Sequence, residues 1–197
     1  MKNLTKVFSC ALFFVFLSTK AQETVSKLTT THNKAVSNKS IVNSTATSKN
    51  HQTLLAVMKA ADLEDLLDHA GPFTVFAPSD LAFANLAGRS VEELLDPKNR
   101  KELRDLLTYH IVAGQITASK ILKAMCRGEG KATFTTIQGG IITATMEGID
   151  IILNDAFGNT ATIVVADSKQ RNGVIHEIDS VILPGKFKSF LNSHLFS

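Results

Sequence analysis

Residues 74–83 read TVFAPSDLAF, and this stretch decides the fold. It opens with β-branched and aromatic residues, which are typical of a short buried strand. Pro78 follows, and because the residue before a proline is held in extended backbone, the strand should end just before it. Ser79 is a preferred N-cap residue and should begin a short helix that presents Ala82 and Phe83 to the core. The stretch therefore predicts a corner at which a buried strand passes directly into a helix.

The chain on both sides of this corner has the apolar spacing of helices. Apolar residues recur at helical spacing over 54–58 and 63–67, and Gly71-Pro72 ends that pattern. Asp96-Pro97 is predicted to begin the longest helix, because proline is tolerated in a first turn. The apolar face predicted for this helix consists of Leu103, Leu106, Leu107, His110 and Ile111. Another helical piece is predicted near 119–125.

From residue 132 onward the pattern becomes that of strands. Short β-branched and apolar runs alternate with glycine-containing turns. The predicted strands cover 132–137, 141–146, 149–153, 161–166 and 174–183. Helices first and strands later predict an α+β domain, in which the early strand 73–76 joins the late sheet.

A second informative stretch is NGVIHEIDSVILP, at residues 172–184. It opens with Asn172-Gly173, a turn dipeptide that tolerates positive φ. Side chains alternate along an unbroken strand, so two faces are predicted: Val174, His176, Ile178 and Ile182 on one, and Ile175, Glu177 and Asp179 on the other. Both faces carry apolar residues, so this strand should be central in the sheet.

Both stretches resemble the paired signatures of the fasciclin domain family, and Tyr109-His110 between them resembles that family's Tyr-His segment. The signature residues are Thr74, Val75, Phe76, Ala77, Pro78, Ala82, Phe83, Asn172, Gly173, Val174, Ile175, His176, Ile178, Asp179 and Pro184. The resemblance implies a fasciclin-like fold over residues 40–185, a β-sheet wedge flanked by several short helices. It also implies work outside the cytoplasmic membrane, in cell adhesion or in organising an extracellular matrix or cell surface.

The first 21 residues have the three parts of a cleavable export signal. Lys2 and Lys6 form a basic start, and residues 7–17 are apolar apart from one serine. Small residues at the last and third-last positions of the segment predict cleavage after Ala21. A membrane anchor is the alternative, but this run is shorter than the roughly 20 residues that a spanning helix needs. A lipid anchor on Cys10 is a weaker alternative. The sequence thus predicts a signal peptide (1–21), a flexible polar linker (22–39), the domain, and a C-terminal tail (186–197), with a secreted, periplasmic or cell-surface location.

Removal of this signal changes the charge and the cysteine content. Three of the 21 basic residues lie in the signal, so the remainder carries 18 basic and 18 acidic residues. A neutral chain lacks the basic surface that binds nucleic acid by counterion release, and no nucleic-acid partner is expected. Cys126 is then the single cysteine, which cannot form an internal disulfide. No later segment is apolar enough to be predicted as a transmembrane helix.

Tyr109 and His110 are the candidate partner-binding residues, because the resemblance links this segment to receptor contacts. His110 follows Leu106 and Leu107 at helical spacing, so a buried, hydrogen-bonded role is favoured for it. Tyr109 lies off that apolar stripe and is the better candidate of the two for an exposed contact. His176 is expected to make a structural hydrogen bond, since strand alternation sends Glu177 and Asp179 to the opposite face.

Catalytic and metal-binding patterns are scarce. The chain has no nucleophile elbow, phosphate loop or zinc-binding His-Glu-x-x-His pair. Cys126 has Arg127 beside it in a predicted loop but no general base, and residues 154–159 carry too few carboxylates for a calcium site. The sequence therefore predicts no enzyme activity, no cofactor and no metal. An unrecognised hydrolase that uses His110 or His176 stays open as an alternative.

The leading interpretation is a secreted or surface-associated module that promotes adhesion by binding a cell-surface or matrix protein or a glycan. A second interpretation is a structural envelope protein that self-associates, which a neutral net charge permits. The sequence leaves the ligand and the oligomeric state open.

Overall fold

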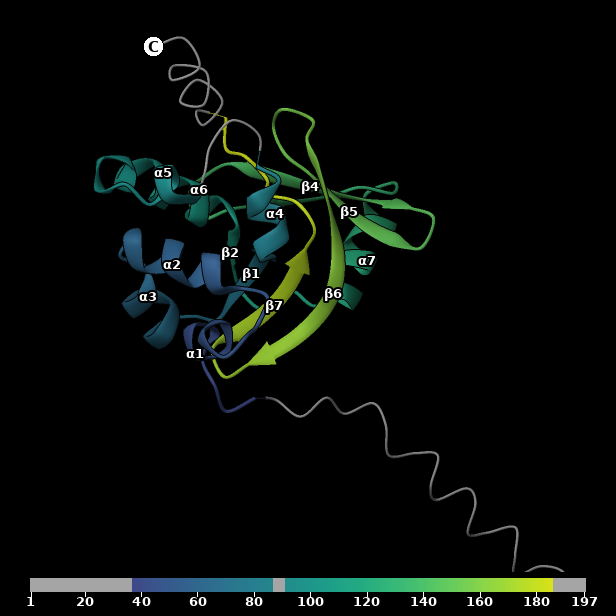
Figure 1. The fold of residues 1–197 in the computed structure, drawn as a ribbon. Helices are drawn as coiled ribbons and strands as arrows, with labels where there is room; N and C mark the ends of the chain where they lie inside the picture. Colours follow the sequence, from purple (N-terminus) through teal and green to yellow (C-terminus); the bar gives the residue numbers. More distant parts are fainter. Residues whose placement is uncertain (1–36, 87–90, 186–197) are drawn as a thin grey trace, which may run out of the picture. The chain divides into compact units, whose positions relative to one another are not determined.

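The structure is a computed structural model, and it describes residues 37–86 and 91–185 (Figure 1). The predicted signal peptide, the linker up to residue 36 and the predicted tail lie outside the described residues. The last linker residues contact the domain, because the Ser37 N–H donates to the Lys169 carbonyl and the Lys39 carbonyl accepts from the Arg171 N–H.

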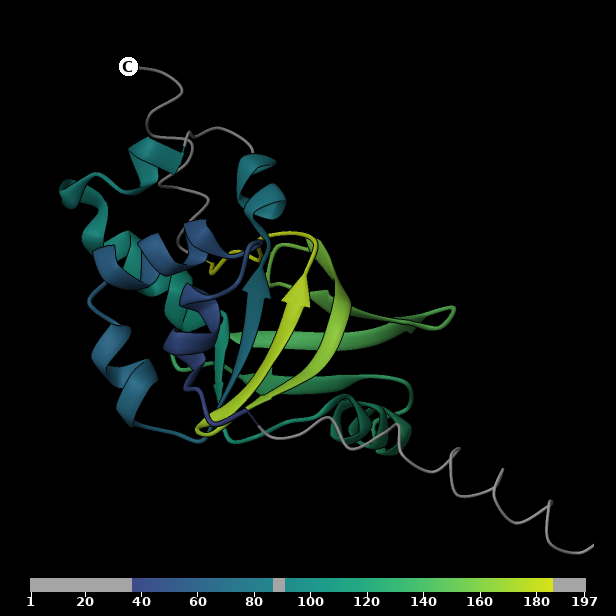
Figure 2. The same cartoon turned by 60° about the horizontal axis from the view of Figure 1, so that its bottom comes forward.

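Most helices come from the first half of the domain, as the apolar spacing predicts. They are α1 (Ile41–Ala46), α2 (Gln52–Ala60), α3 (Glu64–His69), α4 (Asp80–Ala84), α5 (Val91–Leu94), the 3-10 turn η1 (Pro97–Asn99), α6 (Arg100–Tyr109) and α7 (Ala118–Arg127). Figures 1 and 2 show α1, α2, α3 and α6 grouped on one side of the sheet, whereas α7 lies near β4 and β5 on another. No helix among the residues described is long and apolar enough to cross a membrane.

The strands form one strongly curved sheet. They are β1 (Phe73–Pro78), β2 (Ile111–Ala113), β3 (Ala132–Thr135), β4 (Ile141–Glu147), β5 (Asp150–Asn154), β6 (Thr160–Gln170) and β7 (Gly173–Ile178). Their spatial order is β2-β1-β7-β6-β5-β4-β3, with β1 and β7 parallel and the other neighbours antiparallel. A bridge between Val112 and Thr136 joins the two ends, so the sheet almost closes into a barrel.

Strand β1 separates two hydrophobic cores, because its side chains alternate between the two faces of the sheet. Val75 and Ala77 belong to the core shared with α1–α6. Phe76 points into the second core, which lies between the curved sheet and α7 and includes Tyr109 and Ile142. Both cores are needed, since the described part of the chain contains no disulfide and its Cys126 is a free, exposed thiol.

The structure confirms the α+β class and the fasciclin-like arrangement of helices and sheet. The early strand joins the late sheet as predicted, since β1 pairs with β7 along its whole length. Strand β7 is also central, lying between β1 and β6.

Several predicted element boundaries are wrong. Asp96-Pro97 begins the 3-10 turn η1, whereas α6 begins at Arg100 and is no longer than α7, since each has 10 residues. Ile111 was expected on the apolar face of the long helix but begins β2, because the backbone at His110 already accepts a sheet-like hydrogen bond from the Phe76 N–H. The strand predicted over 174–183 ends at Ile178, where Asp179 turns its carboxylate to the backbone N–H of Thr162, 2.7 Å away.

Candidate functional site

The front signature is a structural corner, as its sequence predicts. Ser79 caps α4 by accepting a hydrogen bond from the Ala82 N–H at 3.1 Å. Asp80 caps α2 from outside that helix, because its carboxylate accepts from the N–H groups of Gln52 and Thr53 at 3.3 and 2.7 Å. Burial by itself would raise the pKa of Asp80. The hydrogen bonds from these N–H groups lower the pKa by more, so the pKa of Asp80 lies below its usual value.

The rear signature ties distant segments together through Asn172. Its side-chain oxygen accepts from the Ile41 N–H at 2.9 Å, at the start of α1. Its amide nitrogen donates to the carbonyls of Leu67 and Ala70 at 2.7 and 2.9 Å, at the end of α3. A single side chain therefore satisfies backbone groups at the ends of two helices.

Gly173 is required by close backbone approach. A Cβ atom at this position would lie 2.0 Å from the carbonyl oxygen of Phe73, and the residue has φ +157. Only glycine lets β7 begin beside β1 at this distance.

His176 makes the structural hydrogen bonds expected of it. It is fully buried, its Nδ1 accepts from the Asp167 N–H at 3.2 Å, and its Nε2–H donates to the Ile116 carbonyl at 2.8 Å. The ring also stacks on Phe76, with 5.7 Å between ring centroids. Burial lowers the pKa of His176 below its ordinary value, so the ring is neutral at physiological pH.

His110 is buried as predicted, and both ring nitrogens have backbone partners. Nδ1–H donates to the Leu106 carbonyl at 2.9 Å, and Nε2 accepts from the Ile182 N–H at 3.3 Å. Burial lowers the pKa of His110 to about 4. These contacts, together with those of His176, contradict a hydrolase that uses either histidine, since such an enzyme needs an accessible ring.

The prediction that Tyr109 is an exposed contact is wrong. Tyr109 is 1% exposed and belongs to the core between the sheet and α7. One side of α6 faces the other helices, and Tyr109 does not lie on it. Tyr109 lies on another side of α6, which the sheet covers. The hydroxyl donates to the Ile141 carbonyl at 2.8 Å, and burial raises the pKa of Tyr109. Neither residue of the Tyr109-His110 pair is therefore presented to a partner.

Two other residues considered in the sequence, Asp155 and Cys126, do not form a catalytic or metal-binding group with other side chains in the part of the chain that the structure describes. Asp155 organises its own turn and holds the segment after β7, because its carboxylate accepts from the N–H groups of Phe157, Asn159 and Leu183. Cys126 lies in the last turn of α7 rather than in a loop, and it is exposed. Within 37–86 and 91–185, no cluster of three or more histidine, cysteine or acidic side chains could hold a metal ion.

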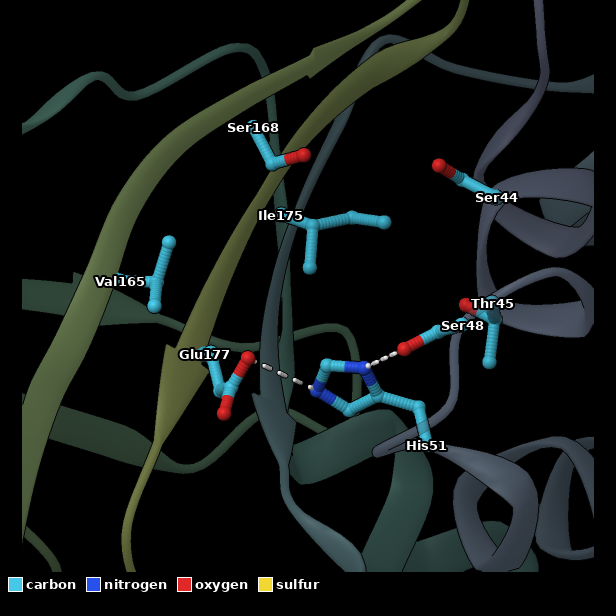
Figure 3. A pocket seen from close by; sticks show the side chains of 8 residues that line it. All are labelled: Ser44, Thr45, Ser48, His51, Val165, Ser168, Ile175 and Glu177. Carbon is cyan, nitrogen blue, oxygen red and sulfur yellow. Dashed lines mark hydrogen bonds and ion pairs between the residues drawn. The ribbon is translucent and has the colours of Figure 1, made fainter.

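A pocket of about 170 Å³ lies between the α1–α2 segment and the outer face of β6 and β7 (Figure 3). It is lined by Ser44, Thr45, Ser48, His51, Val165, Ser168, Ile175 and Glu177. Side chains alternate along β7, so Ile175 and Glu177 point to the face opposite His176, as predicted from the sequence. These two residues form part of the wall that the sheet contributes to the pocket. No pattern in the sequence indicated that residues 44–51 would cover that face.

The polar centre of this pocket is a row of three side chains. Ser48 Oγ lies 2.8 Å from His51 Nδ1, and His51 Nε2 lies 3.7 Å from Glu177 Oε2 (Figure 3). Ser48 Oγ also accepts from the Asn50 N–H, which leaves its own hydrogen free to be donated to Nδ1. When Ser48 donates to Nδ1, the proton of His51 is on Nε2 and faces Glu177.

This row has the residue types of a hydrolytic triad but not its geometry. The separation of 3.7 Å between His51 and Glu177 is too long for the hydrogen bond that orients a catalytic base. The arrangement is better suited to binding a polar ligand between donor and acceptor groups.

Comparison with known proteins agrees with this fold. The fasciclin domain model matches residues 49–184. A Synechocystis protein, sll1483, is 41% identical over 145 residues, which cover 73% of each chain. The cell surface glycolipoprotein MPB83 of Mycobacterium bovis is 31% identical over 123 residues, or 62% of this chain and 48% of that protein.

A solved structure is similar at the level of the fold. A FAS1 domain pair from the insect cell adhesion molecule Fasciclin I superposes with a TM-score of 0.67 at 18% identity, covering 76% of this chain and 52% of that one. The signature residues, the helix and strand arrangement and the family match agree with one another. The chain belongs to the fasciclin family.

Proposed function

We propose that this protein is exported and acts as a secreted or surface-associated binding module that promotes adhesion to a cell surface, a matrix or a neighbouring cell. The observation that carries the proposal is the contrast between its two sets of polar side chains. Both ring nitrogens of His110 and of His176 are bonded to backbone, whereas His51 and Glu177 line a pocket and His51 Nε2 has no hydrogen-bond partner. Such an arrangement favours recognition over catalysis.

Family membership supports the same function. One relative is a mycobacterial cell surface glycolipoprotein, and the similar solved structure comes from an insect cell adhesion molecule. The export signal predicted in residues 1–21 supports export, since the segment has a basic start, an apolar run and small residues before the cleavage site.

Mass spectrometry of the protein recovered outside the cells should find Gln22 as its first residue, and an intact N-terminus would contradict cleavage.

Attachment of a deletion strain tests this function. Loss of the gene should lower surface attachment and biofilm mass, and a plasmid copy should restore both. Unchanged attachment in the deletion strain, together with no binding of the purified protein to envelope or matrix preparations, would contradict the proposal.

Self-association is the second candidate, and exposed apolar side chains favour it. Ile149 at the β4–β5 turn is 93% exposed, and Val164 on β6 is half exposed. Neighbouring exposed apolar side chains, such as Val164 and Val165 on β6, can contribute to an interface between copies when they form a continuous patch. Sedimentation over a range of concentrations tests this candidate, and a monomer throughout would remove it.

A further inference from the structure

The pocket between α1 and the strands β6 and β7 is lined by a residue, His51, with a buried polar atom that has no hydrogen-bond partner. Within residues 37–86 and 91–185, the buried side-chain atoms without a hydrogen-bond partner are His51 Nε2 and Gln170 Oε1. His51 lines the pocket, and Gln170 donates its amide to Ser168 Oγ, which also lines it, at 3.1 Å. Gln170 itself does not line the pocket, whereas His51 does. Buried polar atoms are normally paired, so His51 Nε2 points to a missing partner in this pocket.

His51 and Glu177 are placed so that one hydroxyl beside them can bond to both. The two atoms are 3.7 Å apart, which is too far for a direct bond but close enough for one oxygen atom to contact both. His51 Nε2–H is a donor and the Glu177 carboxylate is an acceptor. A hydroxyl satisfies both groups, because it can accept from the His51 N–H and donate to Glu177 at the same time. An ammonium cannot accept from the His51 N–H, and a carboxylate would be repelled by the carboxylate of Glu177.

The rest of the lining suits a molecule with several hydroxyls and an apolar face. Figure 3 shows Ser44 and Ser168 at one end of the pocket, His51 and Glu177 at the other, and Ile175 between them. The hydroxyls can exchange hydrogen bonds with a ligand, and the side chain of Ile175 can contact its carbon atoms. A sugar ring combines these two kinds of surface.

The volume of the pocket and the charge of its lining limit which sugars can bind. A volume of about 170 Å³ is below the roughly 300 Å³ at which pockets for drug-sized ligands begin, so one sugar residue is the appropriate size. The lining contains a carboxylate and no lysine or arginine, so an acidic sugar would be repelled. We propose that this pocket binds a single neutral sugar residue of a surface or matrix glycan, with His51 and Glu177 holding one of its hydroxyls.

Proton–nitrogen NMR of the labelled full-length exported protein tests this inference. Galactose, glucose, mannose and N-acetylglucosamine are titrated separately to concentrations well above roughly 10 mM, because an isolated sugar residue should bind only in the millimolar range. At least one should shift the amide signals of residues 44–51, 165–168 and 175–177 in a saturable way.

Two variants and one control locate the binding. Glu177→Gln keeps the side-chain shape but replaces a charged acceptor, so it should weaken the binding about tenfold. Ser44→Ala removes one hydroxyl from α1 and should weaken it by a smaller factor without loss of folding. Glu147→Gln changes an exposed glutamate on β4 and should leave the affinity unchanged.

This inference rests on the proposed function but fails separately from it. If no sugar shifts the pocket signals, or if Glu177→Gln binds as well as the wild type, the inference is overturned, and ordered water satisfies His51 instead. The adhesion function then stands or falls on the attachment of the deletion strain alone.

Discussion

Replacement of Asn172 by alanine should destabilise the domain strongly, although Asn172 does not line the pocket at His51 and Glu177. The change removes the bonds to the Ile41 N–H and to the carbonyls of Leu67 and Ala70. Each net hydrogen bond contributes about 1 kcal/mol, and buried backbone groups left without partners cost at least as much. We therefore expect a loss of about 3 kcal/mol in the free energy of unfolding, a large part of the 5–15 kcal/mol typical of a domain.

Urea unfolding followed by far-UV circular dichroism measures this loss, because the chain has no tryptophan for a fluorescence assay. The matched control is Asn43→Ala, since Asn43 is exposed and makes one long bond to Asp68 at 3.3 Å. The control should change the free energy of unfolding by less than about 0.5 kcal/mol. If Asn172→Ala were no more destabilising than Asn43→Ala, the structural role of this signature residue would be refuted.

Three more predictions concern the signature segments. His110 stays neutral in the folded protein down to a pKa of about 4, whereas the unfolded chain takes up this proton near pH 6.5, so its contribution to stability falls by about 3 kcal/mol as the pH drops through that window. Urea unfolding should show this decline, and an unchanged stability at about pH 4.5 would contradict it. Asp80→Ala removes the cap of α2 and should cost about 1 kcal/mol in the same assay, whereas an unchanged midpoint would show that α2 needs no cap. Gly173→Ala places a methyl group against the Phe73 carbonyl and should abolish soluble folded protein, whereas Gly185→Ala, with open space around it, should express normally. Equal yields of folded protein from these two variants would refute the close approach of β7 to β1.

Features that depend on neighbouring residues could be predicted from the sequence. The corner at Ser79 follows from a proline that ends a strand and a serine that caps a helix, and both effects act within a few residues. The two faces of β7 follow from alternation, which correctly placed His176 in the interior and Glu177 on the other side.

Features that depend on distant contacts could not be predicted in this way. Asn172 is separated from its three partners by 131, 105 and 102 residues, so its role as a tie between helices is not visible locally. Tyr109 was misplaced because helical spacing shows which side of α6 faces other helices, but not that the sheet covers a second side. The pocket combines residues 44–51 with 165–177, and only the folded chain brings these segments together.

Attachment of the deletion strain carrying different plasmid copies tests most directly whether this protein promotes adhesion through the pocket at His51 and Glu177. The wild-type gene and the Glu147→Gln control should restore attachment fully. Glu177→Gln, exported in the same amount and equally stable, should restore it only in small part. Full restoration by Glu177→Gln would contradict adhesion through this pocket.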